Sequence, residues 1–215
     1  MARTAVAVPP ALARRGNRVI RPRDAADVYA HPRAELARLA RSGAVRRLAP
    51  GYYVLVPPQW LGDDRWQPEL AAAALGVAQT DYGASAVALM GVSAARHHGA
   101  VPRAVAVAVV AVPKQRPALN TPYGSVIFVK RDTGRLDLER VDTSLTSGWV
   151  TTVEQTLLDL ASRPTLGGLT ATDTAEAIRS LATRADWDLV RQLAEDQHRP
   201  GALRDALRTA GRDHA

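Results

Sequence analysis

Arginine side chains gather in and before one short segment of the chain, RSGAVRRLAPGYYVLVP (residues 41–57). Arg41, Arg46 and Arg47 lie inside it, and Arg33 and Arg38 come shortly before it. The planar guanidinium group forms paired hydrogen bonds with phosphate oxygens, and it stays charged at every physiological pH. This group of arginines therefore predicts a site that binds phosphate groups, and not a catalytic site.

The charge of the whole chain is distributed unevenly. The first 60 residues hold 11 arginines against the three acids Asp24, Asp27 and Glu35, whereas the remainder holds 17 basic and 18 acidic residues. All of the net charge of +7 therefore belongs to the first quarter of the chain. Such asymmetry indicates a polyanion partner for that segment, and the alternative is a solvated basic face.

Residue patterns typical of catalysis are absent from the sequence. A metal-dependent nuclease needs an acidic residue two positions before a lysine, but the only lysines, Lys114 and Lys130, follow Val112 and Phe128 at that spacing. There is no glycine-rich phosphate loop and no Gly-x-Ser-x-Gly elbow. Two acids in the run LDLER (136–140) could be interpreted as a catalytic pair, yet a polar loop edge explains them more simply. We expect no catalytic residue and no enzymatic activity.

The histidines do not predict a metal site either. None forms a His-x-x-x-His pair, and His97 and His98 are adjacent, so that on a helix they would point about 100° apart. The chain has no cysteine, which excludes thiolate ligands and disulfides and fits a cytoplasmic protein. No apolar run approaches the roughly 20 residues that span a bilayer. We therefore expect no metal, no cofactor and no membrane partner.

The elements around the arginines have the order of a winged helix-turn-helix. Two short helices are expected at 9–16 and 21–29, with an extended piece at 18–20 between them, and a third at 32–43 carries leucines on one face and arginines on the other. A hairpin follows, in which residues 44–48 pair with 52–56 across the turn at Pro50-Gly51. In such a fold the third helix enters the major groove and the wing lies along the phosphates. The predicted DNA-binding residues are Arg21, Arg23, Arg33, Arg38, Arg41, Arg46 and Arg47.

The rest of the chain predicts a second unit. We place the boundary in the acidic and aromatic segment QWLGDDRWQ (59–67), which gives a DNA-binding domain at 1–62 and a C-terminal domain at 63–215. Helices are expected at 68–79 and 85–99, strands at 105–113 and 123–132 around a loop at 114–122, and a helix at 150–161 begun by a capping box of Thr151 and Glu154. Asp173 and Asp186 are expected to cap later helices. The fold class is α+β, with a C-terminal α/β domain that ends in a helical tail.

A second group of basic residues surrounds the two strands of this unit. These side chains are either solvated loop ends or a contact patch for an acidic partner. They are Lys114, Arg116, Lys130, Arg131 and Arg135.

Four segments in this order resemble the AbiEi family, the antitoxins of type IV toxin-antitoxin systems. They are RSGAVRRLAPGYYVL (41–55), SAVALMGVSAARHHG (85–99), VPRAVAVAV (101–109) and GWVTTVEQTLLDLA (148–161). The resemblance extends from about Arg21 to the C-terminal helices, and its best matches are Gly51-Tyr52-Tyr53 and Thr156-Leu157-Leu158-Asp159. Ala49-Pro50 departs from the family wing, which usually carries a basic residue before the glycine.

The resemblance implies a non-enzymatic antitoxin with two partners. The winged helix would bind inverted repeats in double-stranded DNA of its own promoter as an autorepressor, as a monomer in solution or a dimer on DNA. The C-terminal domain would counteract a nucleotidyltransferase-like toxin, directly or indirectly, and the second basic group would be its toxin-neutralising patch. The alternative is a stand-alone winged-helix transcription regulator whose C-terminal domain senses a ligand.

Overall fold

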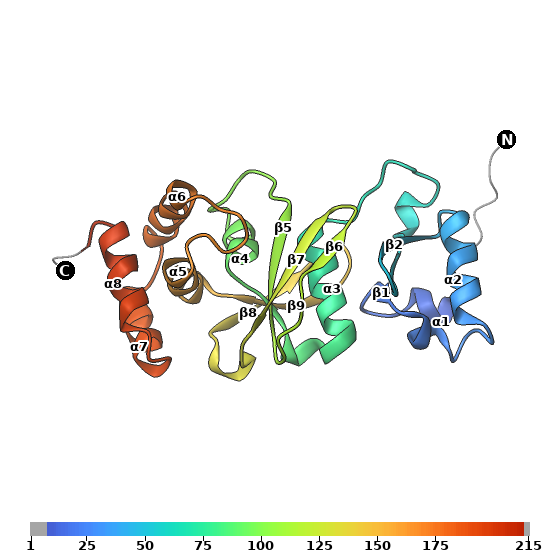
Figure 1. Ribbon diagram of the computed structural model, residues 1–215, viewed down its shortest axis with the longest axis horizontal. Coiled ribbons are helices and arrows are strands. Elements are labelled where there is room, and N and C mark those ends of the chain that lie inside the picture. The colour runs from blue at the N-terminus through green and yellow to red at the C-terminus, as the bar shows by residue number, and fades with distance from the viewer. Residues whose placement is uncertain (1–7, 213–215) are drawn as a thin grey trace.

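The computed structural model describes residues 8–212 and has the predicted α+β fold. Its N-terminal part forms a winged helix, which lies at one end of the elongated molecule in Figure 1. In chain order the elements are α1 (Pro10–Ala13), β1 (Val19–Ile20), the 3₁₀ helix η1 (Pro22–Ala25), α2 (Pro32–Arg41), β2 (Val45–Ala49) and β3 (Tyr52–Leu55).

Local signals fix the helix α2 and the wing that follows it. Pro32 occupies the first helical position, and Leu36 and Leu39 are completely buried. Gly43 has φ 80° just after the helix, where the amide of Ala44 donates to the carbonyl of Leu39, so the helix ends in a Schellman motif. The predicted hairpin is confirmed, with a register shift between Arg47 and Ala49, and β1 pairs with the other edge of β3.

The middle of the chain is a six-stranded mixed sheet in the order β6-β7-β5-β4-β9-β8. Strand β5 pairs in parallel with β7 and antiparallel with β4, and β4 pairs in parallel with β9. The strands are β4 (Ala88–Leu89), β5 (Val107–Val112), β6 (Leu119–Thr121), β7 (Gly124–Lys130), β8 (Leu138–Asp142) and β9 (Ser147–Thr151).

Helices cover both faces of this sheet (Figure 1). Val109 and Ala111 of β5 pack into the core beneath the C-terminal helices, whereas Val110 and Val112 pack into the core with α3. This alternation explains why β5 is apolar throughout: both of its faces are buried. The helices are α3 (Leu70–Tyr82), α4 (Val92–His97), α5 (Val153–Ser162), α6 (Ala171–Ala182), α7 (Trp187–Asp196) and α8 (Pro200–Thr209), and further 3₁₀ turns are η2 (Pro58–Trp60), η3 (Ala84–Ala86) and η4 (Thr133–Arg135).

Several predicted elements of this unit are corrected. Residues 85–99 form no continuous helix, because Gly91 has φ 54° and separates β4 from α4. The loop expected at 114–122 contains the edge strand β6, and the run LDLER leads into strand β8. The sequence did not predict β6 and β8 because short edge strands lack the long apolar run that predicts the buried strand β5.

The caps of the C-terminal helices are shifted from their predicted positions. The N-cap of α5 is Thr152, whose hydroxyl accepts from the amide of Gln155, in place of Thr151. Asp173 completes a capping box whose N-cap is Thr170, and Asp186 caps α7 as predicted. These shifts are of one to three residues, which is usual for helix ends predicted from a single sequence.

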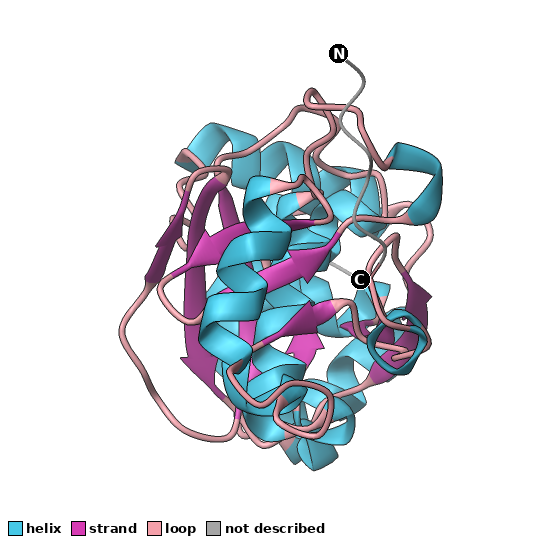
Figure 2. Cartoon of the chain, turned by 90° about the vertical axis from the view of Figure 1, so that its right-hand side faces the viewer, coloured by secondary structure: helices cyan, strands magenta, loops and turns pink. Residues whose placement is uncertain are grey.

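The winged helix and the central sheet share one core through α3. Val19 and Val54 of the winged helix pack in the same buried cluster as Leu75 of α3 and Val110 of the sheet. Gly76 lets the two elements meet, because a Cβ atom there would lie 2.5 Å from Cγ2 of Val19. Figure 2 views the molecule from the winged-helix end. The division at residue 62 stays a prediction, and these contacts cross it.

Among the described residues, no helix is both long enough and apolar enough to cross a membrane.

Candidate functional sites

Helix α2 presents an arginine face away from its buried leucines. Arg33, Arg38 and Arg41 are all exposed, as the helical period predicts. The Nε of Arg38 donates to Glu35 one turn earlier at 2.9 Å, which holds its guanidinium close to the helix surface. A row of cations on an exposed helix that follows a helical turn is the arrangement by which winged helices enter a major groove.

The wing carries one outward arginine and one inward arginine. Arg47 is exposed, but Arg46 points to the other face of β2 and its Nη2 donates to the carbonyl oxygens of Asp63 at 3.0 Å and Asp64 at 2.8 Å. The guanidinium of Arg46 also lies 6.0 Å from the ring centre of Trp66. The expectation that both arginines extend one cationic surface is therefore corrected. Arg46 holds the segment that follows the wing through these contacts, and Arg47 is the one of the two that is exposed.

Arg21 is likewise held inside the protein. It pairs with Asp24 at 3.3 Å, forms a short ion pair with Asp81 of α3, and donates to the carbonyl of Thr80. Its side chain is 16% exposed, against 67% for Arg23. Arg21 therefore ties the winged helix to α3, whereas Arg23 is directed to solvent.

The second basic group does not form one patch, because Arg116 belongs to the junction between the winged helix and the sheet. Its Nη1 pairs with Asp81, and its guanidinium lies 4.4 Å from the ring centre of Phe128. The hydroxyl of Tyr52 donates to the same carboxylate at 2.7 Å. Burial raises the pKa of Tyr52, and its hydrogen bond to Asp81 adds to this rise. Arg116 is thus corrected from a partner contact to an internal ion pair.

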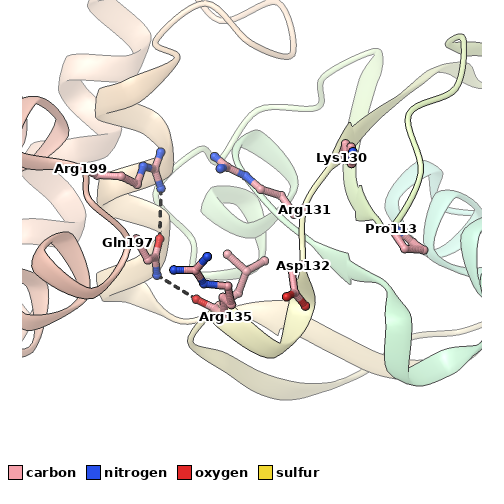
Figure 3. A pocket seen from close by; sticks show the side chains of 8 residues that line it. Pro113, Lys130, Arg131, Asp132, Arg135, Gln197 and Arg199 are labelled. Atoms are coloured by element: carbon pink, nitrogen blue, oxygen red, sulfur yellow. Dashed lines mark hydrogen bonds between the residues drawn. The ribbon is translucent and has the colours of Figure 1, made fainter.

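Three residues of that group, Lys130, Arg131 and Arg135, line a basic pocket (Figure 3). The cavity measures about 540 Å³. Lys114 does not line it, although the neighbouring Pro113 does. The lining residues are Pro113, Lys130, Arg131, Asp132, Arg135, Leu136, Gln197 and Arg199.

A buried carboxylate, Asp159, orients two arginines of this pocket. Its side chain is 1% exposed, with Arg199 Nη1 at 2.9 Å and Arg131 Nη2 at 3.6 Å from Oδ1. Burial raises the pKa of Asp159, and Arg199 followed by Arg131 opposes that rise. This aspartate is the last residue of the run Thr156-Leu157-Leu158-Asp159. The run therefore supplies both buried residues of α5 and the carboxylate that orients the arginines of the pocket.

Arg199 and Gln197 were missed by sequence reasoning. Gln197 bridges the pocket: its amide nitrogen donates to the carbonyl of Arg135 at 3.1 Å, and its amide oxygen lies 3.5 Å from Nη1 of Arg199 (Figure 3). Both follow α7, and His198 between them adopts φ 54°. No local pattern marks them, because their partners on α5 and in η4 are distant in sequence.

The comparison with known proteins identifies the N-terminal unit. No curated protein matches the chain. Residues 8–56, which contain the whole winged helix from α1 to β3, match the family model described as a transcriptional regulator, AbiEi antitoxin. The resemblance to AbiEi antitoxins is thereby confirmed in this segment, which is similar to the AbiEi antitoxin transcriptional regulators that the model describes.

Proposed function

We propose that this protein is an antitoxin that represses its own promoter and counteracts a nucleotidyltransferase-like toxin, without enzymatic activity of its own. The observation that carries the proposal is the match of residues 8–56 to AbiEi antitoxin regulators, on a winged helix whose recognition helix and wing present exposed arginines. DNA binding is supported both by the exposed arginines of α2 and the wing and by the family match. Neutralisation of a toxin is supported by the family match alone.

On DNA, α2 enters the major groove and the wing follows the phosphate backbone. Arg33 and Arg38 reach base edges or phosphates from the helix, and Arg47 contacts phosphate from the wing. Arg23 and Arg41 complete the exposed group, while Arg21 and Arg46 hold the unit in place. Because the operators of such regulators are inverted repeats, two copies of the chain bind one operator as a dimer on DNA.

In the C-terminal domain, the basic pocket is the contact for the toxin. Lys130, Arg131 and Arg135 line it together with Arg199, against only two acids, Asp132 and the buried Asp159. Guanidinium groups held by a buried carboxylate are oriented in advance, which suits them to an acidic surface of a partner. Lys114 lies beside this pocket as an additional charge.

The same pocket favours one alternative, a regulator whose C-terminal domain senses a small anionic ligand, because about 540 Å³ is a volume typical of ligand sites. Co-expression with the toxin candidate encoded beside this gene separates the two functions. An antitoxin restores growth of cells that express the toxin, whereas a ligand-sensing regulator leaves them arrested. A promoter shift assay in parallel shows that the protein used is active on DNA.

A further inference from the structure

The end of α4 and the edge strand β8 bring two imidazoles and a carboxylate together. His97 Nε2 lies 3.7 Å and His98 Nδ1 lies 3.9 Å from Oε1 of Glu139. The three donor atoms all lie within 4.8 Å of one another. We propose that His97, His98 and Glu139 form a binding site for a divalent transition-metal ion of the zinc class.

The hydrogen bond behind His98 prepares this side chain as a ligand. Its Nε2 lies 2.7 Å from the carbonyl oxygen of Thr151, which can only accept, so Nε2 carries the proton and Nδ1 keeps its lone pair. A backbone carbonyl behind a ligating imidazole is the usual support that fixes the tautomer and the ring orientation in metal sites.

The spacing of the donor atoms is close to that of a metal site. Zinc bonds of about 2.0–2.1 Å in a tetrahedron place neighbouring ligand atoms roughly 3.3 Å apart. The two histidine–glutamate distances exceed this by only a few tenths of an ångström, and all three donor atoms lie within 4.8 Å of one another, so a bound ion would draw them closer. The side chains of His97 and Glu139 are 36% and 47% exposed, so both can rotate inward, while His98 at 7% exposed stays fixed.

His97 also borders a small cavity, which neither His98 nor Glu139 lines. A cavity of about 120 Å³ beside His97 is also lined by the acidic residues Glu69 and Asp142 and by Arg96. Such a volume holds a metal-bound water. Two histidines, one carboxylate and a water are the ligand set of open zinc sites. Two positive charges oppose a bound cation: Arg96 beside the cavity, and Arg184, whose guanidinium donates to the carbonyl of His98.

The sequence did not predict this site because the third ligand is not local. Adjacent histidines on a continuous helix diverge, and only the fold places Glu139 of β8 against the end of α4. A bound ion would clamp the last turn of α4 to the edge of the sheet. The inference does not depend on the proposed antitoxin function.

Titration calorimetry of the full chain without an affinity tag, with Zn²⁺ as the probe, tests the site, and Co²⁺ absorption reports the ligand geometry. We expect one ion per chain, a raised melting temperature, and weaker binding at about pH 5.5 than at about pH 7.5, because imidazole ligands must be deprotonated. His97→Ala and Glu139→Gln should each weaken binding by about tenfold or more. The exposed controls His31→Ala and Glu195→Gln should bind as the wild type does.

Two results would overturn the proposal. One is the absence of saturable one-to-one binding of Zn²⁺ to the wild-type chain. The other is an unchanged dissociation constant in both ligand variants, which would assign any binding to other surface groups. Glu139→Gln keeps the size of the side chain, so it remains informative if His97→Ala lowers the yield of folded protein.

Discussion

The hydroxyl of Tyr52 on the wing strand β3 donates a 2.7 Å hydrogen bond to Asp81 at the end of α3. The same carboxylate pairs with Arg21 of the winged helix and Arg116 after strand β5. One acidic group therefore bridges two guanidiniums and joins the N-terminal unit to the central sheet. These ion pairs add to the apolar contacts of Val19 and Val54 with α3, which attach the winged helix to the same part of the chain.

Removing that charge should destabilise the protein. The side chains of Asp81, Arg21 and Arg116 are 12%, 16% and 22% exposed, so Asp81→Asn leaves Arg116 without its carboxylate and Arg21 with Asp24 alone. We expect a loss of about 3 kcal/mol in the free energy of unfolding, measured by urea denaturation. Asp27→Asn is the matched control, because its pair with Arg15 is exposed and should be worth at most about 1 kcal/mol. Equal losses in the two variants would contradict the assigned role of Asp81.

The two neighbouring arginines of the wing should behave differently on DNA. Arg47→Ala removes an exposed cation and should reduce the slope of log affinity against log salt by about 0.9, the value for one phosphate contact. Arg46→Ala should leave that slope unchanged and lower thermal stability, because its guanidinium bonds to the carbonyls of Asp63 and Asp64. Fluorescence anisotropy over a salt series measures the first effect. A reversed outcome would place Arg46, and not Arg47, on the DNA.

The arginines of α2 should contribute to sequence preference. A bidentate contact from arginine to a guanine discriminates by about 1–3 kcal/mol, so Arg33→Ala or Arg38→Ala should narrow the gap between operator and random DNA by such an amount. Competition binding with both DNAs measures the gap. Arg179→Ala, an exposed arginine on α6, serves as the control and should not change it. An unchanged gap in both α2 variants would restrict this helix to non-specific contacts.

Acid should weaken the start of α6 through Asp173. Hydrogen bonds from the backbone and hydroxyl of Thr170 lower the pKa of Asp173 below its ordinary value of 3.8, with Arg103 as a further cause. Because the folded-state pKa is the lower one, this stabilisation is complete above the unfolded-state pKa and is lost as the pH falls through the folded-state pKa. Asp173→Asn should therefore be less stable than the wild type at neutral pH, and the difference should shrink in acid below pH 3.8. A difference that stays constant with pH would rule out the carboxylate as its source.

Helix α2 and the hairpin of the wing could be predicted because their signals are local, whereas the helix expected at 21–29 is only the short 3₁₀ turn η1. Pro32, the buried leucines and Gly43 fix α2, and the alternation of residues 44–56 fixes the wing. The two-residue period of a strand also implies that Arg46 and Arg47 face opposite sides, a consequence that the prediction of a shared surface overlooked. The local pattern was sufficient to predict α2 and the wing, and to predict that Arg47 is exposed.

The partners of the remaining arginines could not be predicted from one sequence. Arg21 meets Asp81, and Arg199 meets Asp159, only after strands and helices far apart in the chain have packed together. A basic residue that will be paired internally has the same local pattern as one that will stay exposed. Long-range packing therefore decided which arginines of each predicted group lie at the surface.

This distinction changes how the basic pocket should be tested against a toxin. Reversal of Arg131 would place a carboxylate against the buried Asp159, so a loss of function could reflect misfolding. Lys130 and Arg135 are exposed and line the same cavity, and the double variant Lys130→Glu, Arg135→Glu leaves the pair of Asp159 and Arg199 intact. We expect this variant to keep its melting temperature and its promoter binding, yet to fail to rescue cells that express the toxin, because repulsion across an interface slows the encounter of the partners.

The control variant is Arg179→Glu with Arg204→Glu, which makes the same change in net charge on exposed residues outside the pocket lining and should rescue fully. Full rescue by both variants would remove the pocket from the mechanism, and loss of promoter binding in the pocket variant would instead make the pocket part of the DNA-binding surface.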